Sequence, residues 1–175
     1  MPNSLSIKVG VISDTHGYLD PKVLHYFKEC HEIWHLGDFG QGVSDVLKEN
    51  FTLRGVYGNI DDLEVRNCFP EHLFFELQGL KILLIHIGGY PGKYSKKSND
   101  LIHKYKPDLF LCGHSHVCKV MRDSKNYLLH INPGAAGNQG FHLMKTIMRF
   151  DLINGKISNL EAIELGLRQR SSAPK

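Results

Sequence analysis

Five short apolar runs in this chain each end beside a glycine and an aspartate, asparagine or histidine. The most compact example is Leu111-Cys112-Gly113-His114-Ser115-His116, where two histidines follow a strand-like run that ends in a glycine turn. Neutral imidazole is the commonest metal-binding side chain, and a strand end can direct both rings toward one centre. A chain with eleven histidines can also contain such a pair by chance. Whether this pair binds a metal therefore has to be judged together with the other four runs.

The other runs end in the same way, in Asp14-Thr15-His16-Gly17, Gly37-Asp38, Gly58-Asn59 and His86-Ile87-Gly88. Ligands of open α/β sheets bind outside the carboxyl ends of the strands. Taken singly, each residue has a simpler reading as a helix cap or a turn residue. Five such groups at successive strand ends are hard to explain as caps. They supply seven nitrogen or oxygen donors and no thiolate: Asp14, His16, Asp38, Asn59, His86, His114 and His116.

The number of donors indicates more than one ion. A zinc site uses about four ligands, whereas seven fit two ions that share a carboxylate about 3.5–4 Å apart. The glycine beside each group lets the backbone turn sharply or approach a bound ion closely.

The order of apolar runs predicts a layered α/β protein with mixed sheets. Alternating strands and helices in the first half favour parallel pairing, and the strand-rich second half, with its Asn154-Gly155 turn, favours hairpins. We expect strands at 7–13, 33–36, 53–57, 73–77, 80–87, 109–112, 117–122, 127–131, 146–152 and 156–165. We expect helices at 21–30, 43–49 and 99–105, while most of 62–78 gives no clear pattern.

Composition places the chain among ordinary globular proteins. With 175 residues, 42% hydrophobic and 22% charged, one domain is expected, with a core over about residues 7–165 and a flexible tail over 168–175. A net charge of +3 is too small for a nucleic-acid footprint. No run is long enough to span a membrane, and no signal peptide is recognised, so a cytoplasmic protein is expected. The four cysteines show no C-x-x-C pair, which favours free reduced thiols.

The order and spacing of these motifs resemble those of the calcineurin-like metallophosphoesterases. The resemblance covers about residues 7–165 and every ligand position is filled; the length resembles that of the small single-domain bacterial and archaeal phosphodiesterases. It rests on Ser13-Asp14-Thr15-His16-Gly17, Leu36-Gly37-Asp38, Gly58-Asn59, His86 and Gly113-His114-Ser115-His116. It implies a four-layer α/β/β/α sandwich of two mixed β-sheets. It also implies a binuclear metal-dependent phosphoesterase acting on a small phosphorylated substrate, and phosphodiesters are favoured over monoesters.

The resemblance also implies the role of each donor. Asp14, His16 and His116 would hold the first metal, Asn59, His86 and His114 the second, and Asp38 would bridge both and hold a hydroxide shared between them. Nitrogen and oxygen ligands without sulfur favour Mn²⁺, with Fe, Co, Ni and Zn as alternatives.

Two positions depart from the family's pattern. Ile60 stands where many relatives have a histidine that assists the leaving group, and Ile87 separates His86 from its glycine. Removal of a general acid forfeits about 10²–10⁴-fold in rate, so we expect slow turnover of poor leaving groups. His142, just beyond the Asn132-to-Gly137 turn that the resemblance places near the metals, is a candidate substitute acid; a packing role is equally open.

Other polar residues have a structural reading beside the functional one. Asn59 and Lys93 are expected to contact substrate. Lys96 and Lys97 also follow the His86 turn and could meet the substrate phosphate, although a solvated loop explains all three lysines equally well. Trp34 is expected in the core, His35 is buried or faces away from the site and is not a ligand, and Cys112 is an inert buried thiol.

The alternative function is a non-catalytic scaffold. The small retromer subunit resembles this family but has lost several metal-binding side chains, whereas this chain keeps all seven. That difference favours the enzyme. Nucleic acid is not an expected partner, since no basic stripe with aromatic residues is visible. The oligomeric state stays open, with a homo-oligomer among the alternatives.

Overall fold

The computed structural model describes residues 6–169. Its first sheet consists of β1 (Ile7–Ile12), β2 (Glu32–His35), β3 (Thr52–Gly55), β11 (Met144–Ile153) and β12 (Lys156–Leu167). The second consists of β4 (His72–Leu77), β5 (Leu80–Ile85), β8 (Leu109–Leu111), β9 (Cys118–Asp123) and β10 (Leu128–Pro133). The helices are α1 (Pro21–Phe27), α2 (Val43–Asn50), α3 (Leu63–Cys68) and α4 (Lys96–Tyr105).

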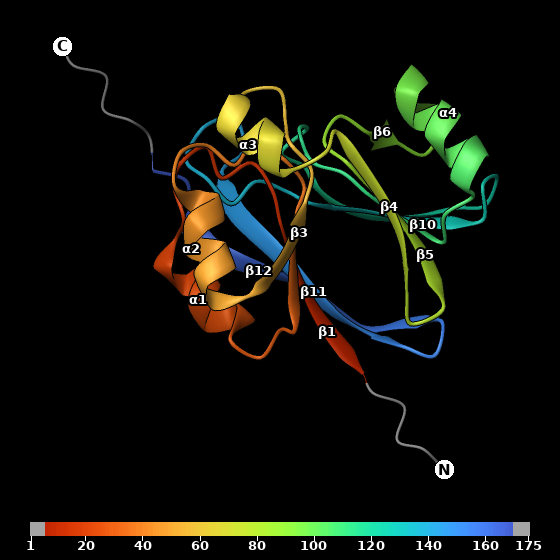
Figure 1. The fold of residues 1–175 in the computed structure, drawn as a ribbon, viewed down its shortest axis with the longest axis horizontal. Coiled ribbons are helices and arrows are strands. Elements are labelled where there is room, and N and C mark those ends of the chain that lie inside the picture. Colours follow the sequence, from red (N-terminus) through yellow and green to blue (C-terminus); the bar gives the residue numbers. More distant parts are fainter. Residues whose placement is uncertain (1–5, 170–175) are drawn as a thin grey trace.

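Both sheets are mixed. The first has the strand order β12-β11-β1-β2-β3 and the second the order β4-β5-β8-β10-β9. β1 pairs with β2 in parallel and with β11 antiparallel, and β5 pairs with β8 in parallel and with β4 antiparallel. The two sheets face each other, with α1 and α2 outside one and α4 outside the other (Figure 1). The expected four-layer sandwich of two mixed sheets is confirmed.

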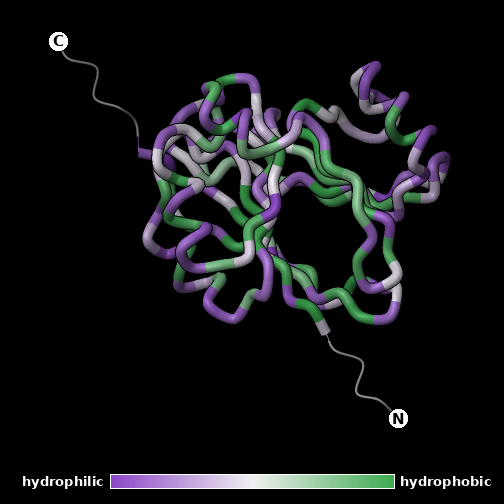
Figure 2. Tube along the Cα trace, viewed as in Figure 1, coloured by the Kyte–Doolittle hydropathy of each residue, from purple (hydrophilic) through white to green (hydrophobic). Residues whose placement is uncertain are grey.

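Three apolar clusters hold these layers together. The central cluster joins residues of both sheets, among them Trp34 and Leu84, and Figure 2 shows hydrophobic segments gathered where the sheets face each other. The outer clusters pack α1, α2 and α3 on the first sheet and α4 on the second. Alternate residues of β5 point to opposite clusters, Ile82 and Leu84 inward and Leu83 and Ile85 toward α4. This period-two burial on both faces explains why the central strands read as continuous apolar runs.

The expected strands are present, and several boundaries differ. α1 ends at Phe27, three residues early, and α4 begins at Lys96 because Ser95 caps it by accepting the Ser98 amide at 3.1 Å.

The unclear stretch after Asp62 contains α3, and the loop after His86 contains a hairpin of β6 (Gly89–Tyr90) and β7 (Lys93–Tyr94). Trp34 and Cys112 are fully buried, as expected.

The C-terminal expectation needs a correction at its start. Arg168 is not frayed, because its side chain donates to the carbonyl of His142 at 2.8 Å and its amide donates to that of Leu143 at 2.8 Å. The next amide, of Gln169, donates to Asn138 Oδ1 at 2.9 Å. The remainder of the expected tail, 170–175, lies outside the described residues. Among the described helices, none is both long and apolar enough to cross a membrane.

Candidate metal centre

The predicted donors lie at the carboxyl ends of parallel strands from both sheets. β1, β2 and β3 are neighbours in the first sheet, and β5 and β8 are neighbours in the second. Backbone bonds tie the loops together: Asp14 N donates to Gly37 O at 3.0 Å and Gly113 N donates to His86 O at 3.0 Å. A bond from His114 N to Asp14 Oδ2 at 3.1 Å joins the two sheets. Residues 100 positions apart in the chain therefore share one centre.

Six of the seven donors form two adjoining clusters. Asp14, His16 and His116 form one, and Asp38, His86 and His114 form the other; within each cluster the candidate ligand atoms all lie within 4.8 Å of one another. The seventh donor, Asn59, adjoins the second cluster with its Oδ1 3.1 Å from His86 Nε2.

Asp38 lies between the clusters. Its Oδ2 is 3.3 Å from His86 Nε2 and 3.7 Å from His16 Nε2. Asp14 Oδ1 in turn lies 3.2 Å from His116 Nε2 and 3.9 Å from His86 Nε2. The two groups of side chains therefore form one continuous centre.

The backbone at this centre is strained. Five candidate ligands have positive φ: Asp14 (54°), His16 (49°), Asp38 (55°), His114 (66°) and His116 (57°). In the part of the chain that is described, ten non-glycine residues have positive φ, so half of them are candidate ligands. Such left-handed residues cost about 1–3 kcal/mol each and cluster at functional sites. The clustering of these positive-φ residues at one point is therefore a further observation in favour of a functional site.

Glycines allow the close approach that this packing needs. A Cβ at Gly37 would lie 2.6 Å from His86 Nδ1, and one at Gly113 would lie 2.8 Å from Asp14 Oδ2. A Cβ at Gly58 would overlap the Asp38 side chain. All three glycines thus permit close approach of the backbone to candidate ligand side chains, while the expected approach to a bound ion stays a prediction.

The environment keeps both carboxylates ionised. Burial alone raises the pKa of Asp14, but the adjacent His116 imidazole, the charge of His86 and the Ser13 hydroxyl hold that pKa below its ordinary value. Burial likewise raises the pKa of Asp38, and the hydrogen bond and charge of His86 outweigh it. Burial lowers the pKa of His86, but the two carboxylates raise it overall. Two anionic carboxylates at one buried point attract positive charge.

Unpartnered polar atoms test whether cations fit here. Asp14 Oδ1 and His16 Nε2 are buried side-chain atoms without a hydrogen-bond partner. Native proteins leave few such atoms unpaired, and each calls for an explanation such as an ion. The donor set is nitrogen and oxygen only, and the atoms converge from different loops, so the residues fit divalent cations.

Hydrogen bonds with backbone groups and with the Ser13 hydroxyl orient the candidate ligands on the side away from the centre. His86 Nδ1 lies 2.7 Å from the carbonyl of Leu36, which can only accept, so Nδ1 carries the proton and Nε2 is directed at the centre. The other oxygen of each aspartate is also engaged: Ser13 Oγ donates to Asp14 Oδ2 at 2.6 Å and Ile60 N donates to Asp38 Oδ1 at 3.0 Å. Each carboxylate is thus oriented with one oxygen free for an ion.

His142 lies beside the first cluster. Its ring packs edge-on against that of His116 with centroids 5.1 Å apart, and its Nε2 lies 3.0 Å from the carbonyl of Gly137. Its Nδ1 is buried without a partner. Burial lowers the pKa of His142 despite the bond to Gly137, which favours the neutral ring. The Asn132 amide donates to Gly113 O at 2.9 Å, so the predicted turn adjoins the centre.

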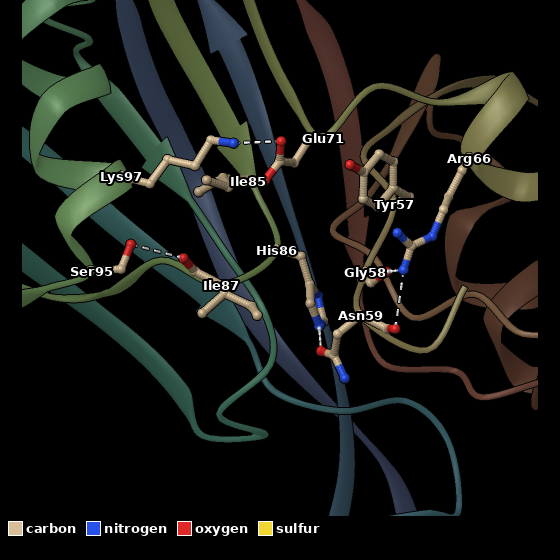
Figure 3. A pocket seen from close by; sticks show the side chains of 10 residues that line it. All are labelled: Tyr57, Gly58, Asn59, Arg66, Glu71, Ile85, His86, Ile87, Ser95 and Lys97. Atoms are coloured by element: carbon tan, nitrogen blue, oxygen red, sulfur yellow. Dashed lines mark hydrogen bonds and ion pairs between the residues drawn. The ribbon is translucent and has the colours of Figure 1, made fainter. Parts of the chain in front are cut away.

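A pocket of about 400 Å³ opens beside the second cluster (Figure 3). Asn59 and His86 line one end of it, and Lys97 lines the far wall. Lys93 lies instead on β7 and is not among the lining residues, so its contact with substrate stays a prediction. Sequence reasoning missed the contribution of Arg66 because α3 was not recognised, and that of Tyr57 because no motif marks this residue at the end of an expected strand.

Together, the two-sheet sandwich and the converging carboxylates and imidazoles define a layered α/β protein with a candidate metal centre. Residues 7–155 match the sequence model of the calcineurin-like phosphoesterase superfamily domain. The chain therefore belongs to the calcineurin-like phosphoesterases.

Individual relatives agree with this assignment. A probable metallophosphoesterase of Methanothermobacter thermautotrophicus is 30% identical over 138 residues, which span 73% of this chain and 76% of the relative. A solved structure described as a novel archaeal phosphodiesterase shares the fold at 22% identity and a TM-score of 0.73, covering 91% of this chain and all 100% of that one. Wild-type Vps29 of Entamoeba histolytica in complex with Zn²⁺ also shares it, at 18% identity and a TM-score of 0.62, over 90% of this chain and 99% of that one.

Proposed function

We propose that this protein is a binuclear metal-dependent phosphodiesterase. The observation that carries the proposal is the pair of adjoining clusters, whose buried donors include Asp14 Oδ1 and His16 Nε2 without partners. Asp14, His16 and His116 would hold one cation, Asn59, His86 and His114 the other, with Asp38 shared by both. The donor set favours Mn²⁺, with Fe, Co, Ni and Zn as alternatives.

The chain's own residues bind and orient the substrate. Two divalent cations bound at the two clusters would supply charge stabilisation for a phosphate and lower the pKa of bound water. Asp38 lies where it can hold the nucleophile between the clusters, and Asn59 can direct its amide at a phosphate oxygen beside the pocket. Most of the reduction in barrier for such reactions comes from electrostatic stabilisation and positioning.

Proton transfer to the leaving group is the weak step of this chain. Ile60 is 48% exposed, and its side chain has no proton that it could donate to a leaving group. His142 is our candidate for proton transfer, since its unpartnered Nδ1 lies next to the first cluster. Its neutral ring accepts a proton more readily than it donates one, so we expect activated aryl diesters to react fastest.

The assay uses bis(p-nitrophenyl) phosphate with Mn²⁺. The wild type is expected to hydrolyse it, and Asp38→Asn is expected to lose activity while keeping its circular dichroism spectrum. Absence of wild-type hydrolysis with every metal named above contradicts the proposal.

The role of His142 has its own test. We expect His142→Ala to lower kcat/KM for a diester with an unactivated alkyl leaving group by about 10²-fold or more, the contribution typical of a proton-transfer residue, and to change kcat/KM for bis(p-nitrophenyl) phosphate much less. An unchanged kcat/KM for the alkyl diester assigns His142 to packing against His116.

A protein-interaction scaffold is the second candidate function, supported by the fold shared with Vps29 proteins. Retention of all seven donors favours the enzyme. We also propose a cytoplasmic location, because the four cysteines are free thiols, which suits a reducing compartment.

A further inference from the structure

The pocket beside the second cluster has walls of contrasting chemistry. It lies between segments of both sheets, with Tyr57 and Arg66 on one side and Ile85, Glu71 and Lys97 on the other (Figure 3). Ile85 is 3% exposed and Ile87 is 45% exposed, so Ile87 provides most of the apolar surface on this side. The volume of the pocket, about 400 Å³, lies within the range of roughly 300–1,000 Å³ that is usual for small-molecule sites. Since His86 and Asn59 close one end, a group bound here would adjoin the phosphate site.

Arg66 forms a fixed planar wall. Its guanidinium lies over the Tyr57 ring at 4.7 Å, its Nε donates to Asp61 O at 2.7 Å, and its Nη2 donates to Asn59 O at 3.2 Å. Several of its donors are therefore occupied by backbone carbonyls. The arrangement offers a flat surface for a ring more than a clamp for a second phosphate.

The opposite wall offers a donor and an acceptor side by side. Lys97 on α4 forms an ion pair with Glu71, and both side chains are 47% exposed. Such exposed pairs contribute only about 0–1 kcal/mol, so a ligand can exchange hydrogen bonds with them at little cost. The pair is neutral as a unit, which again disfavours an extra anionic group and favours a polar uncharged edge.

We propose that this pocket binds a nucleobase, and that the substrate is a nucleoside phosphodiester. A nucleobase is a planar ring with hydrogen-bond donors and acceptors along one edge. It would lie between Ile87 and the Tyr57–Arg66 surface, with its edge against Glu71 and Lys97. The inference rests on the proposed phosphodiesterase function, because it takes the neighbouring end of the pocket as the phosphate site.

Equilibrium binding tests this pocket without relying on turnover. Isothermal calorimetry on the Mn²⁺-loaded protein compares the four common nucleoside 5′-monophosphates with ribose 5-phosphate, which lacks only the base. We expect the tightest nucleotide to bind at least about 10-fold more strongly than ribose 5-phosphate, the value of one charge-assisted hydrogen bond. Glu71→Gln and Lys97→Met are expected to reduce this preference toward unity.

Matched controls lie on α4, which contains Lys97, and on β4, which directly follows Glu71. Lys104→Met changes another exposed lysine of α4, and Glu76→Gln changes an exposed glutamate of β4; neither residue lines the pocket. Both are expected to keep the preference. Equal binding of nucleotides and ribose 5-phosphate by the wild type overturns the inference, as does a preference that survives both pocket substitutions. A wild type that prefers nucleotides yet hydrolyses no diester supports the pocket and contradicts the proposed function.

Discussion

His35 connects the two loops that carry the first three aspartate and histidine donors. Its Nδ1 accepts from Gly37 N at 3.2 Å, so the proton lies on Nε2, which is 3.0 Å from Thr15 Oγ1. The Thr15 hydroxyl then donates to Phe39 O at 2.7 Å, and the His35 ring stacks on Phe39 at 3.6 Å. Burial lowers the pKa of His35 to about 3, which keeps the ring neutral and this bonding pattern intact. It acts as a positioning residue for the centre.

Replacement of His35 tests this link. His35→Phe keeps the stacking on Phe39 but leaves the Gly37 amide and the Thr15 hydroxyl with one partner fewer. An unsatisfied buried donor costs about 1–3 kcal/mol, so the free energy of unfolding in chelator should fall by that amount. A double-mutant cycle with Thr15→Val should show coupling above about 0.5 kcal/mol. Additive effects of the two substitutions contradict the link.

Gly37 sets the distance between its loop and His86. A Cβ there would lie 2.6 Å from His86 Nδ1, at a φ of +97°. We expect Gly37→Ala to displace the ring and weaken Mn²⁺ affinity by about 10-fold or more, as disturbed outer-shell contacts do. Gly42→Ala is the matched control, because Gly42 also has a positive φ, of +77°, but nothing within 4 Å of its Cβ position. Both variants lose stability from backbone strain. Equal Mn²⁺ affinities in a calorimetric titration contradict the role given to Gly37.

The residue types predicted the candidate metal ligands, but not the neighbouring side chains that position them. Strand-end position brought Asp14 and His116 into consideration, and the structure places both in one cluster. The bonds of His35 could not be predicted, because they depend on which turns face each other across β1 and β2. The contact of His142 with His116 depends in the same way on the path of a loop.

At the scale of elements, a buried ion pair attaches α1 to β11. Lys145 Nζ donates to Asp20 Oδ2 at 2.7 Å, and Oδ1 of the same aspartate caps α1 by accepting from Lys22 N at 3.0 Å. Burial raises the pKa of Asp20, but the bonds from Lys145 and Lys22 lower it overall from 3.8. A carboxyl whose pKa is lower in the folded state adds stability above its ordinary pKa. That stability is lost as the pH falls through the folded value.

Asp20→Asn removes the negative charge that pairs with Lys145 and keeps the side-chain oxygen that caps α1. The amide oxygen can still cap α1, but Lys145 is left buried without a counter-charge, so we expect a loss of about 3 kcal/mol at pH 7. The fall in unfolding free energy below about pH 4 should also be shallower than in the wild type. Denaturant titrations across that range, with exposed Asp45→Asn as control, measure both effects. An acid dependence identical to that of the wild type contradicts the pairing.

Helices and strands with a clear pattern of buried residues could be predicted from the sequence, and those without one could not. The central strands were found because both faces are apolar, and the Asn154-Gly155 hairpin because its residues adopt φ of 48° and 73°. α3 was missed, because it spans only Leu63–Cys68 and buries only Val65, which leaves no periodic pattern to detect. The pocket wall that contains Arg66 was missed with it.

At the scale of the whole molecule, the centre exists because two sheets bring their carboxyl edges together. Each sheet alone holds an incomplete donor set: β1, β2 and β3 lead to Asp14, His16, Asp38 and Asn59, while β5 and β8 lead to His86, His114 and His116. Each candidate metal cluster combines side chains from both sheets. Cations bound there would therefore stabilise the folded sandwich, each by about 2.7 kcal/mol at a free concentration 100 times its Kd.

The central claim is that these side chains hold two cations side by side. Its most direct test is the metal content of the purified chain after chelation, reloading with Mn²⁺ and removal of free metal, measured by inductively coupled plasma mass spectrometry. We predict two equivalents per chain for the wild type, and fewer than two for Asp38→Asn with an unchanged circular dichroism spectrum. A folded wild-type protein that retains no metal, or a single equivalent unaffected by the Asp38 substitution, would contradict the claim.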